Sequence, residues 1–430
     1  MAHSILIRGG RVIDPAQEID EVLDLAIKDC RIAGLGKQAP SSADEVVDAR
    51  GQIVAPGLID MHVHLREPGY EETETIATGT AAAVAGGFTA VACMPNTAPP
   101  LDNDAAIEFV LRQAARTARA RVYPIGALTA GRQGKELAEI GMMVRAGARA
   151  FSDDGDGIAE AAVCLRAMRY VAMFDRLFIQ HCEDATLSGR GCMNAGATAT
   201  RLGLSGRPAL AEVAMVQRDL ALAAQTGVRY HVAHVSTAGA VDLIRAAKLR
   251  GQPVTTEATP HHLLLTDEAC GTYDTNYKMN PPLRGAADVQ ACLAGVQDGT
   301  IDCLVTDHAP HGRESKEHEF AYAPFGVIGL ETALPLFIRA LIESKRLSWS
   351  RLIQALSTRP AELLGVPGGS LKVGQPADVA LIDPETAWTI DADRMQSKSR
   401  NTPFDGWQVR GRATATLVEG TWRYRDGAVL

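Results

Sequence analysis

Residues 58–64, LIDMHVH, form an apolar run that ends in two histidines, and this run begins the pattern that decides the fold. Similar runs recur through the middle of the chain. Ala-, Leu- and Arg-rich segments with helical periodicity, such as 105–119 and 209–226, separate them. The eight runs cover residues 58–64, 89–94, 122–128, 148–153, 177–181, 230–235, 253–258 and 303–307.

Strands that alternate with helices predict parallel βαβ units, and eight such units close into a barrel. Both ends of the chain read differently, as short strands separated by turn residues. These strands fall at 5–7, 22–27, 31–33 and 46–47, and again at 378–382, 413–418 and 421–424. We therefore predict an α/β fold with a (β/α)8 TIM-like barrel over 56–365 and a small β-sandwich module formed by both termini, residues 1–55 plus 366–430.

Composition narrows the class of protein. The 430 residues carry a net charge of −8 with 46% hydrophobic and 5% aromatic residues, a balance that disfavours a nucleic-acid partner. The most apolar segment, 81–94, is too short to cross a bilayer, and the N-terminus lacks the pattern of a signal peptide. Eight cysteines without a CxxC pair favour reduced thiols. We expect a cytoplasmic protein with no membrane partner.

Polar and ionisable residues gather at the C-terminal ends of the predicted strands, where barrel enzymes build their active sites. These residues are His62, His64, Asn96, Asp153, Asp154, His181, His234 and Asp307. On a strand, two residues that stand two apart point to the same side, so His62 and His64 can reach one ion. Taken alone, an HxH pair also fits two hydrogen-bonded histidines at a strand end.

Imidazole and carboxylate groups are the ligands expected for zinc. Four histidines and two aspartates suffice for two ions that share a bridging group. Asp307, in VTDHAPH, suits metal binding, general-base catalysis or both, although a capping role also fits.

A second set of residues suits an anionic substrate. Arg66 stands two residues beyond His64, and an arginine pairs with a carboxylate through two parallel hydrogen bonds. Asn96 and Asn280 stand in loops beside prolines, which fix the backbone, although each also fits an ordinary turn. With His311 they form a plausible cradle for a small acid.

The chain resembles bacterial class I dihydroorotases of the amidohydrolase superfamily. The motifs DMHVHLREPG, MPNT, FSDDG, QHCED, HVAHVS, TPHHLLLTDE, NPPLR and TDHAPH occur in the order typical of that family. The tail GSLKVGQPADVALIDP also resembles the superfamily's return to its β module. The similarity extends over nearly the whole chain, and HLREPG with MPNT, NPPLR and DHAPH is far more specific than HxH.

The resemblance implies the reversible cyclisation of N-carbamoyl-L-aspartate to (S)-dihydroorotate and water, a step of pyrimidine biosynthesis. It implies one or two Zn²⁺ ions, with Asp307 as the catalytic acid and base. By position, the implied metal ligands are His62, His64, Asp154, His181, His234 and Asp307. The implied substrate contacts are His64, Arg66, Asn96, Asn280, His311, Phe325 and Gly326. Asp154 rather than Asp153 is taken as the bridging ligand, from its spacing to His181 in the family pattern.

Two alternatives stay open. A hydantoinase or allantoinase shares the barrel and the chemistry, but many such enzymes bridge their ions with a carboxylated lysine on the fourth strand. This sequence has no lysine between Lys135 and Lys248, an interval that contains the fourth run. Some dihydroorotase-like chains are non-catalytic subunits of aspartate transcarbamoylase, but this chain keeps every ligand position. Aspartate transcarbamoylase and further copies of the chain are the predicted protein partners.

Overall fold

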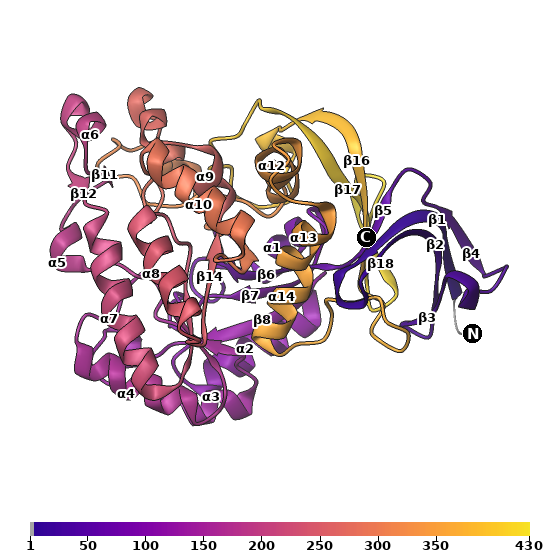
Figure 1. The fold of residues 1–430 in the computed structure, drawn as a ribbon, viewed down its shortest axis with the longest axis horizontal. Helices are drawn as coiled ribbons and strands as arrows, with labels where there is room; N and C mark the ends of the chain where they lie inside the picture. Colours follow the sequence, from indigo (N-terminus) through magenta and orange to yellow (C-terminus); the bar gives the residue numbers. More distant parts are fainter. Residues whose placement is uncertain (1–3) are drawn as a thin grey trace.

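A parallel barrel of eight strands forms the centre of the computed structural model, which describes residues 4–430 (Figure 1). Residues 1–3, where the predicted β module begins, lie outside the described residues. The barrel strands are β6 (Leu58–Val63), β7 (Phe88–Cys93), β8 (Arg121–Gly126), β9 (Ala150–Phe151), β10 (Leu177–Gln180), β13 (Arg229–Val232), β14 (Val254–Ala258) and β15 (Cys303–Leu304). Each overlaps one of the predicted runs. The predicted α/β barrel is confirmed.

The barrel strands are rich in apolar residues because both of their faces are covered. Every residue of β6, β7, β10 and β14 is buried. The larger helices that alternate with the strands are α1 (Ile76–Ala85), α2 (Asp104–Thr117), α3 (Ile140–Ala146), α4 (Ala161–Ala172), α7 (Leu210–Thr226), α8 (Ala238–Leu249) and α10 (Ala286–Asp298). None of the helices within residues 4–430 is long and apolar enough to cross a membrane.

The barrel closes between its first and last strands through a single bridge in the described chain. Val63 pairs in parallel with His308, and the His64 amide donates to the His308 carbonyl at 2.8 Å. The His308 side chain is buried and lies 3.3 Å from Glu74. The loop that carries Asp307 is therefore joined directly to the strand that carries His62 and His64.

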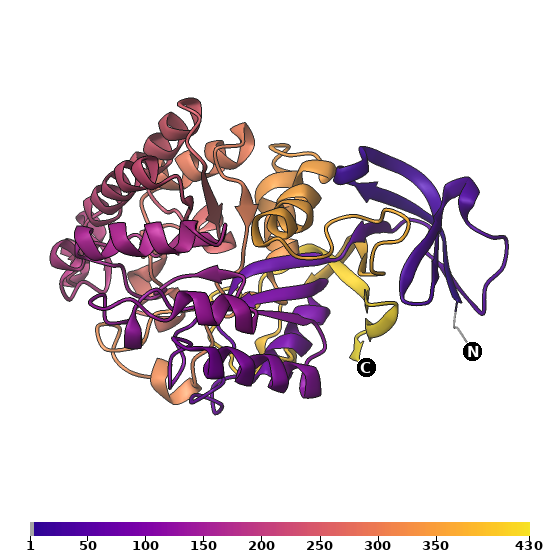
Figure 2. The ribbon, with the colours of Figure 1, turned by 90° about the horizontal axis from the view of Figure 1, so that it is seen from below.

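Both termini contribute to a second, nine-stranded sheet. Its strands are β1 (Ser4–Asp14), β2 (Ile19–Lys28), β3 (Arg31–Leu35), β4 (Glu45–Asp48), β5 (Ile53–Pro56), β16 (Val379–Thr389), β17 (Gln408–Val418), β18 (Thr421–Arg425) and β19 (Ala428–Val429). The N-terminal and C-terminal parts join where β5 pairs with β16. In Figure 2 the N-terminal strands project away from the barrel, and the C-terminal strands lie nearer to it. The boundaries at residues 55/56 and 365/366 stay a prediction.

A hydrophobic core shared by both termini holds this sheet together. Ile5, Leu25 and Ile27 pack in one cluster with Val379, Leu381 and Leu417. Such burial contributes roughly 1.5–3 kcal/mol for each large aliphatic side chain. Because the cluster needs residues from both ends of the chain, neither end can complete it alone.

Candidate active site

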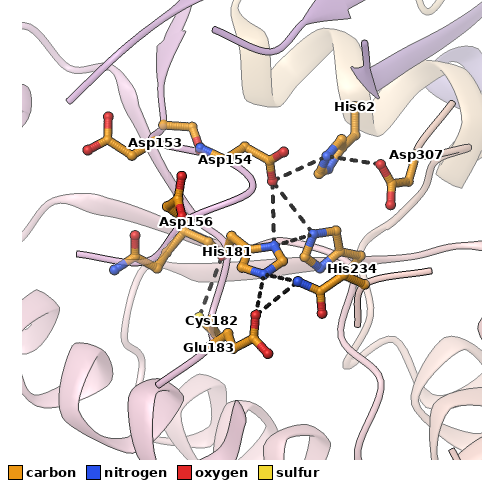
Figure 3. Close-up of polar contacts among 12 residues, drawn as sticks. His62, Asp153, Asp154, Asp156, His181, Cys182, Glu183, His234 and Asp307 are labelled. Carbon is orange, nitrogen blue, oxygen red and sulfur yellow. Dashed lines mark hydrogen bonds and ion pairs between the residues drawn. The ribbon is translucent and has the colours of Figure 1, made fainter. Parts of the chain in front are cut away.

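Six side chains predicted as metal ligands meet at the C-terminal end of the barrel, and Figure 3 shows five of them. His62 belongs to β6 and His64 follows it, whereas the other four follow β9, β10, β13 and β15. All six residues, His62, His64, Asp154, His181, His234 and Asp307, are at most 7% exposed. The structure thus brings together residues that span 246 positions of the sequence, from 62 to 307 inclusive.

The first group of candidate ligand atoms surrounds His62 and His64. Asp307 Oδ1 lies 3.1 Å from His64 Nε2 and 3.5 Å from His62 Nε2. The two carboxylate oxygens of Asp154 each lie 3.5 Å from one of the same two nitrogens. Two imidazoles and two carboxylates therefore face one point.

The second group consists of His181 and His234, and it shares Asp154 with the first. His181 Nδ1 lies 3.0 Å from His234 Nε2, and these atoms lie 3.8 Å and 3.6 Å from Asp154 Oδ1. Asp154 thus contacts both groups, which is the position that a bridging ligand requires.

Asp153 points away from both groups. Its carboxylate accepts hydrogen bonds from the Leu128 and Thr129 amides and from the Thr129 hydroxyl. It therefore anchors the loop that follows β8. The geometry supports the choice of Asp154 over Asp153 as the candidate ligand.

Hydrogen bonds from Nδ1 fix the ring orientation of His62, on β6, and of His64, which follows it. His62 Nδ1 lies 2.5 Å from Glu257 Oε1, and His64 Nδ1 lies 2.8 Å from Asn96 Oδ1. Because a carboxylate or amide oxygen accepts the proton on Nδ1, Nε2 of each ring is left without a proton for an ion. Asn96, predicted as a substrate contact, therefore also orients His64.

Sequence reasoning missed Glu257. This residue is fully buried on β14, and its second oxygen lies 3.0 Å from Nε2 of His231. Its carboxylate also accepts from the His234 amide at 3.2 Å. The available signal was an acidic residue inside an otherwise buried strand, since an unpaired charge there would be costly.

Three site residues have a left-handed backbone that non-glycine residues seldom adopt. Their φ values are 62° for Arg66, 27° for His234 and 48° for Asp307. Such a conformation costs about 1–3 kcal/mol and tends to occur at functional sites. It also explains why β13 ends before the predicted strand end at residue 235, because His234 at positive φ leaves the extended strand.

The site fits a divalent cation on the evidence of its unpaired atoms and its charge. His62 Nε2 and Asp154 Oδ1 are buried without a hydrogen-bond partner among residues 4–430. Burial lowers the pKa of His62, but the carboxylates of Asp154, Glu257 and Asp307 outweigh it and raise that pKa well above its ordinary value. A metal ion would take the place of the proton on His62 Nε2 and would satisfy the unpaired Asp154 Oδ1 among these negative charges.

Four of the substrate-binding candidates, Arg66, His311, Phe325 and Gly326, lie in or against residues 309–326, which we call the substrate loop. Arg66 Nε donates to the Pro310 carbonyl at 3.1 Å, and His311 Nε2 donates to the Phe325 carbonyl at 2.7 Å. Burial, followed by the charges of Arg66 and Lys316, lowers the pKa of His311 to about 3. His311 is therefore a neutral hydrogen-bonding group beside the positive charge of Arg66.

Asn280 and Phe325 are two further substrate-binding candidates, and other side chains hold both in place. Asn280 Nδ2 donates to Glu183 Oε2 at 2.9 Å, while its Oδ1 is buried without a partner in the described chain. The Phe325 ring contacts two cations, the Arg207 guanidinium at 4.4 Å and Lys278 Nζ at 4.5 Å from its centroid. Such contacts hold the ring in place.

Comparisons with known proteins agree with this geometry. A family model described as Dihydro-orotase-like matches residues 51–240, and one described as Amidohydrolase family matches residues 204–424. A dihydroorotase of Syntrophotalea carbinolica is 52% identical over 421 residues, which cover 98% of this chain and 99% of that protein. A dihydroorotase of Pelotomaculum thermopropionicum is 51% identical over 425 residues, 99% of each chain.

Solved structures with the same architecture include hydantoinases. An L-hydantoinase (dihydropyrimidinase) from Arthrobacter aurescens superposes with a TM-score of 0.90 at 26% identity and covers 100% of this chain and 97% of its own. A dihydropyrimidinase from Brevibacillus agri gives a TM-score of 0.87 at 23% identity, with 99% and 96% covered. The second likeness concerns the fold alone.

Proposed function

The chain belongs to the dihydroorotase family of cyclic amidohydrolases, and from that premise we propose that it interconverts (S)-dihydroorotate and N-carbamoyl-L-aspartate with one or two bound Zn²⁺ ions. The observation that carries the proposal is the position of Asp154 between the His62/His64/Asp307 group and the His181/His234 pair. Zinc ions held there would supply Lewis-acid activation of water and of the ring carbonyl.

Asp307 is the proposed proton carrier. Its Oδ1 faces His64 and His62, while none of the described residues hydrogen-bonds its Oδ2. Burial raises the pKa of Asp307, but the charge of His62 and the hydrogen bond to His64 outweigh it and hold this pKa below its ordinary value, so the group is ionised. In ring opening, Asp307 accepts a proton from the attacking water and delivers it to the departing ring nitrogen. In ring closure, it takes a proton from the ureido nitrogen that attacks the side-chain carboxyl carbon and delivers it to the carboxyl oxygen that leaves as water.

Substrate recognition is assigned to the residues around the substrate loop. Arg66 would bind the carboxylate on the ring, with Asn96 beside it. His311 would donate to the same carboxylate by releasing the Phe325 carbonyl, which now accepts its single ring proton. The unpaired Asn280 Oδ1 would accept from a ring N–H, and the Phe325 and Gly326 backbone would cover the ring. His64, which contacts both Asp307 and Asn96, joins the metal side to the substrate side.

The hydantoinase reading is the second candidate because solved hydantoinases share the fold. It is disfavoured by the absence of lysine between residues 135 and 248, since Asp154 occupies the fourth-strand position. The predictions of a cytoplasmic location, of self-association and of an aspartate transcarbamoylase partner also stay proposals.

Turnover of the purified, zinc-loaded chain on dihydroorotate, hydantoin and allantoin tests the proposal. We expect ring opening of dihydroorotate to have by far the highest kcat/KM of the three. A preference for hydantoin or allantoin would replace the assignment, and no turnover of any substrate with zinc bound would favour a non-catalytic subunit.

A further inference from the structure

A segment from the terminal module crosses to the barrel's active-site end. Residues 396–402 lie in the connection between β16 and β17 and contact two barrel loops. The Ser399 hydroxyl donates to the Thr73 carbonyl at 2.8 Å, and Lys398 Nζ donates to the Glu71 carbonyl at 2.5 Å. These contacts hold the loop that begins with Arg66.

Asn401, in the same segment, contacts both ends of the substrate loop. Its Nδ2 donates to the carbonyls of Ala309 and Gly326, each at 3.0 Å, and its Oδ1 accepts from the His311 amide at 3.1 Å. The Asn401 backbone carbonyl also accepts from the Ile328 amide at 2.9 Å. Asn401 is 4% exposed, and both protons of its amide group are used.

Along residues 309–311, hydrogen bonds to Asn401 alternate with a hydrogen bond to Arg66, a candidate substrate contact. Along the chain, the Ala309 carbonyl binds Asn401, the Pro310 carbonyl binds Arg66 and the His311 amide binds Asn401. The ring of His311 then reaches across to the Phe325 carbonyl at 2.7 Å. Asn401 therefore reinforces the junction of the two loop ends, where the Ala309 amide also donates directly to the Val327 carbonyl at 2.8 Å.

Gly326 allows this close approach. Its φ is 140°, and a Cβ atom there would lie 2.8 Å from the Ala309 carbonyl and 3.0 Å from the His311 ring. The two ends of the loop thus pack backbone against backbone, and a side-chain amide 75 residues further along the chain joins them.

We propose that Asn401 is a positioning residue of the active site: it holds His311, Phe325 and Gly326 in the arrangement that binds the substrate ring and its carboxylate. The identity of the substrate rests on the proposed function. The claim that Asn401 keeps the substrate loop ordered does not. The terminal module thereby supplies a part that the barrel's active site needs.

The test uses the full-length, zinc-loaded chain with Asn401→Ala and the near-isosteric Asn401→Asp. In Asn401→Asp the acceptor for His311 remains, but a carboxylate replaces the donor to two carbonyls. Each lost hydrogen bond is worth about 1 kcal/mol, so we expect KM for dihydroorotate to rise about tenfold or more in both variants. We expect kcat to change by less than about threefold, since ground-state binding is affected. Zinc content should stay unchanged.

A second readout needs no substrate. Amide hydrogen exchange across residues 309–328 should be faster in both Asn401 variants than in the wild type. Asp14→Asn is the matched control, because the buried Asp14 accepts from the Leu371 amide and the Ser370 hydroxyl within the terminal module. It should lower the melting temperature and leave both KM and exchange in the loop unchanged.

Unchanged KM and unchanged loop exchange in the Asn401 variants would overturn the inference, as would an equal effect of Asp14→Asn. If the wild type does not open dihydroorotate, the proposed function fails. The exchange measurement then still decides whether Asn401 orders the substrate loop.

Discussion

Nδ1 of His62 lies 2.5 Å from Oε1 of Glu257, a carboxylate that solvent does not reach. The contact determines which nitrogen of the His62 ring faces Asp154 and Asp307. Glu257 also accepts from the His234 amide, so it supports one histidine in each of the two candidate ligand groups. A residue without direct contact to an ion therefore helps to define both positions.

Replacing Glu257 should weaken metal binding. Loss of an outer partner of a ligating histidine typically costs about 10–100-fold in metal affinity, and we expect Glu257→Ala to fall in that range. Competition of the purified protein with a chromogenic zinc chelator measures the affinity. Asp219→Asn is the control, since Asp219 is equally buried but contacts Gln180, Arg218 and Tyr230. If Glu257→Ala bound zinc as tightly as the wild type, Glu257 would not be needed to orient the candidate metal ligands.

Removal of the Asp307 carboxylate charge should lower kcat more than any other substitution proposed here. General acid–base catalysis contributes about 10²–10⁴-fold, so kcat of Asp307→Asn should fall by at least two powers of ten. Zinc per chain must be measured in the same preparation, because Asp307 is also a candidate ligand. Asp156→Asn, an exposed carboxylate near the site, should retain its rate. A near-normal rate with zinc retained would contradict the role of Asp307.

Arg66 should discriminate charged from neutral substrates. Loss of a hydrogen bond to a charged group costs about 1.5–3 kcal/mol, so Arg66→Ala should lower kcat/KM for dihydroorotate by roughly one to two powers of ten. The loss for hydantoin, which lacks the carboxylate, should be much smaller. Arg313→Ala serves as the control because its guanidinium is exposed and lies in the substrate loop, which Arg66 contacts. Equal losses on both substrates would mean that Arg66 only supports the Pro310 backbone.

Glu331 should make stability depend on pH. Burial raises the pKa of Glu331 to about 8 from an ordinary value of 4.5. The folded protein therefore holds this proton more tightly than the unfolded chain. The contribution of Glu331 to stability is fully present below pH 4.5 and is lost as pH rises from 4.5 through 8. Glu331→Gln should flatten the decrease in melting temperature between pH 5 and 9, whereas Glu343→Gln, at an exposed site, should not. Parallel curves for wild type and Glu331→Gln would refute this account.

The sequence was sufficient for the barrel because its strands are buried on both faces and read as apolar runs. It was also sufficient for the histidines, because parallel strands bring their C-terminal ends together. Asp153 and Asp154 could not be separated by residue type, since the direction of each side chain depends on the backbone after β9. Asn401 lies 90 residues from His311 and resembles any loop asparagine. Its role depends on the path of the β16–β17 connection.

The central claim is that Asp154 joins two metal positions into one active site, and the zinc content of two neighbouring variants tests it most directly. Zinc per chain should be measured by mass spectrometry in Asp154→Ala and Asp153→Ala, each reconstituted with zinc with and without bicarbonate. The account predicts that Asp154→Ala loses zinc, that Asp153→Ala keeps it, and that bicarbonate changes neither result. Full zinc content in Asp154→Ala, or loss in Asp153→Ala instead, would contradict it.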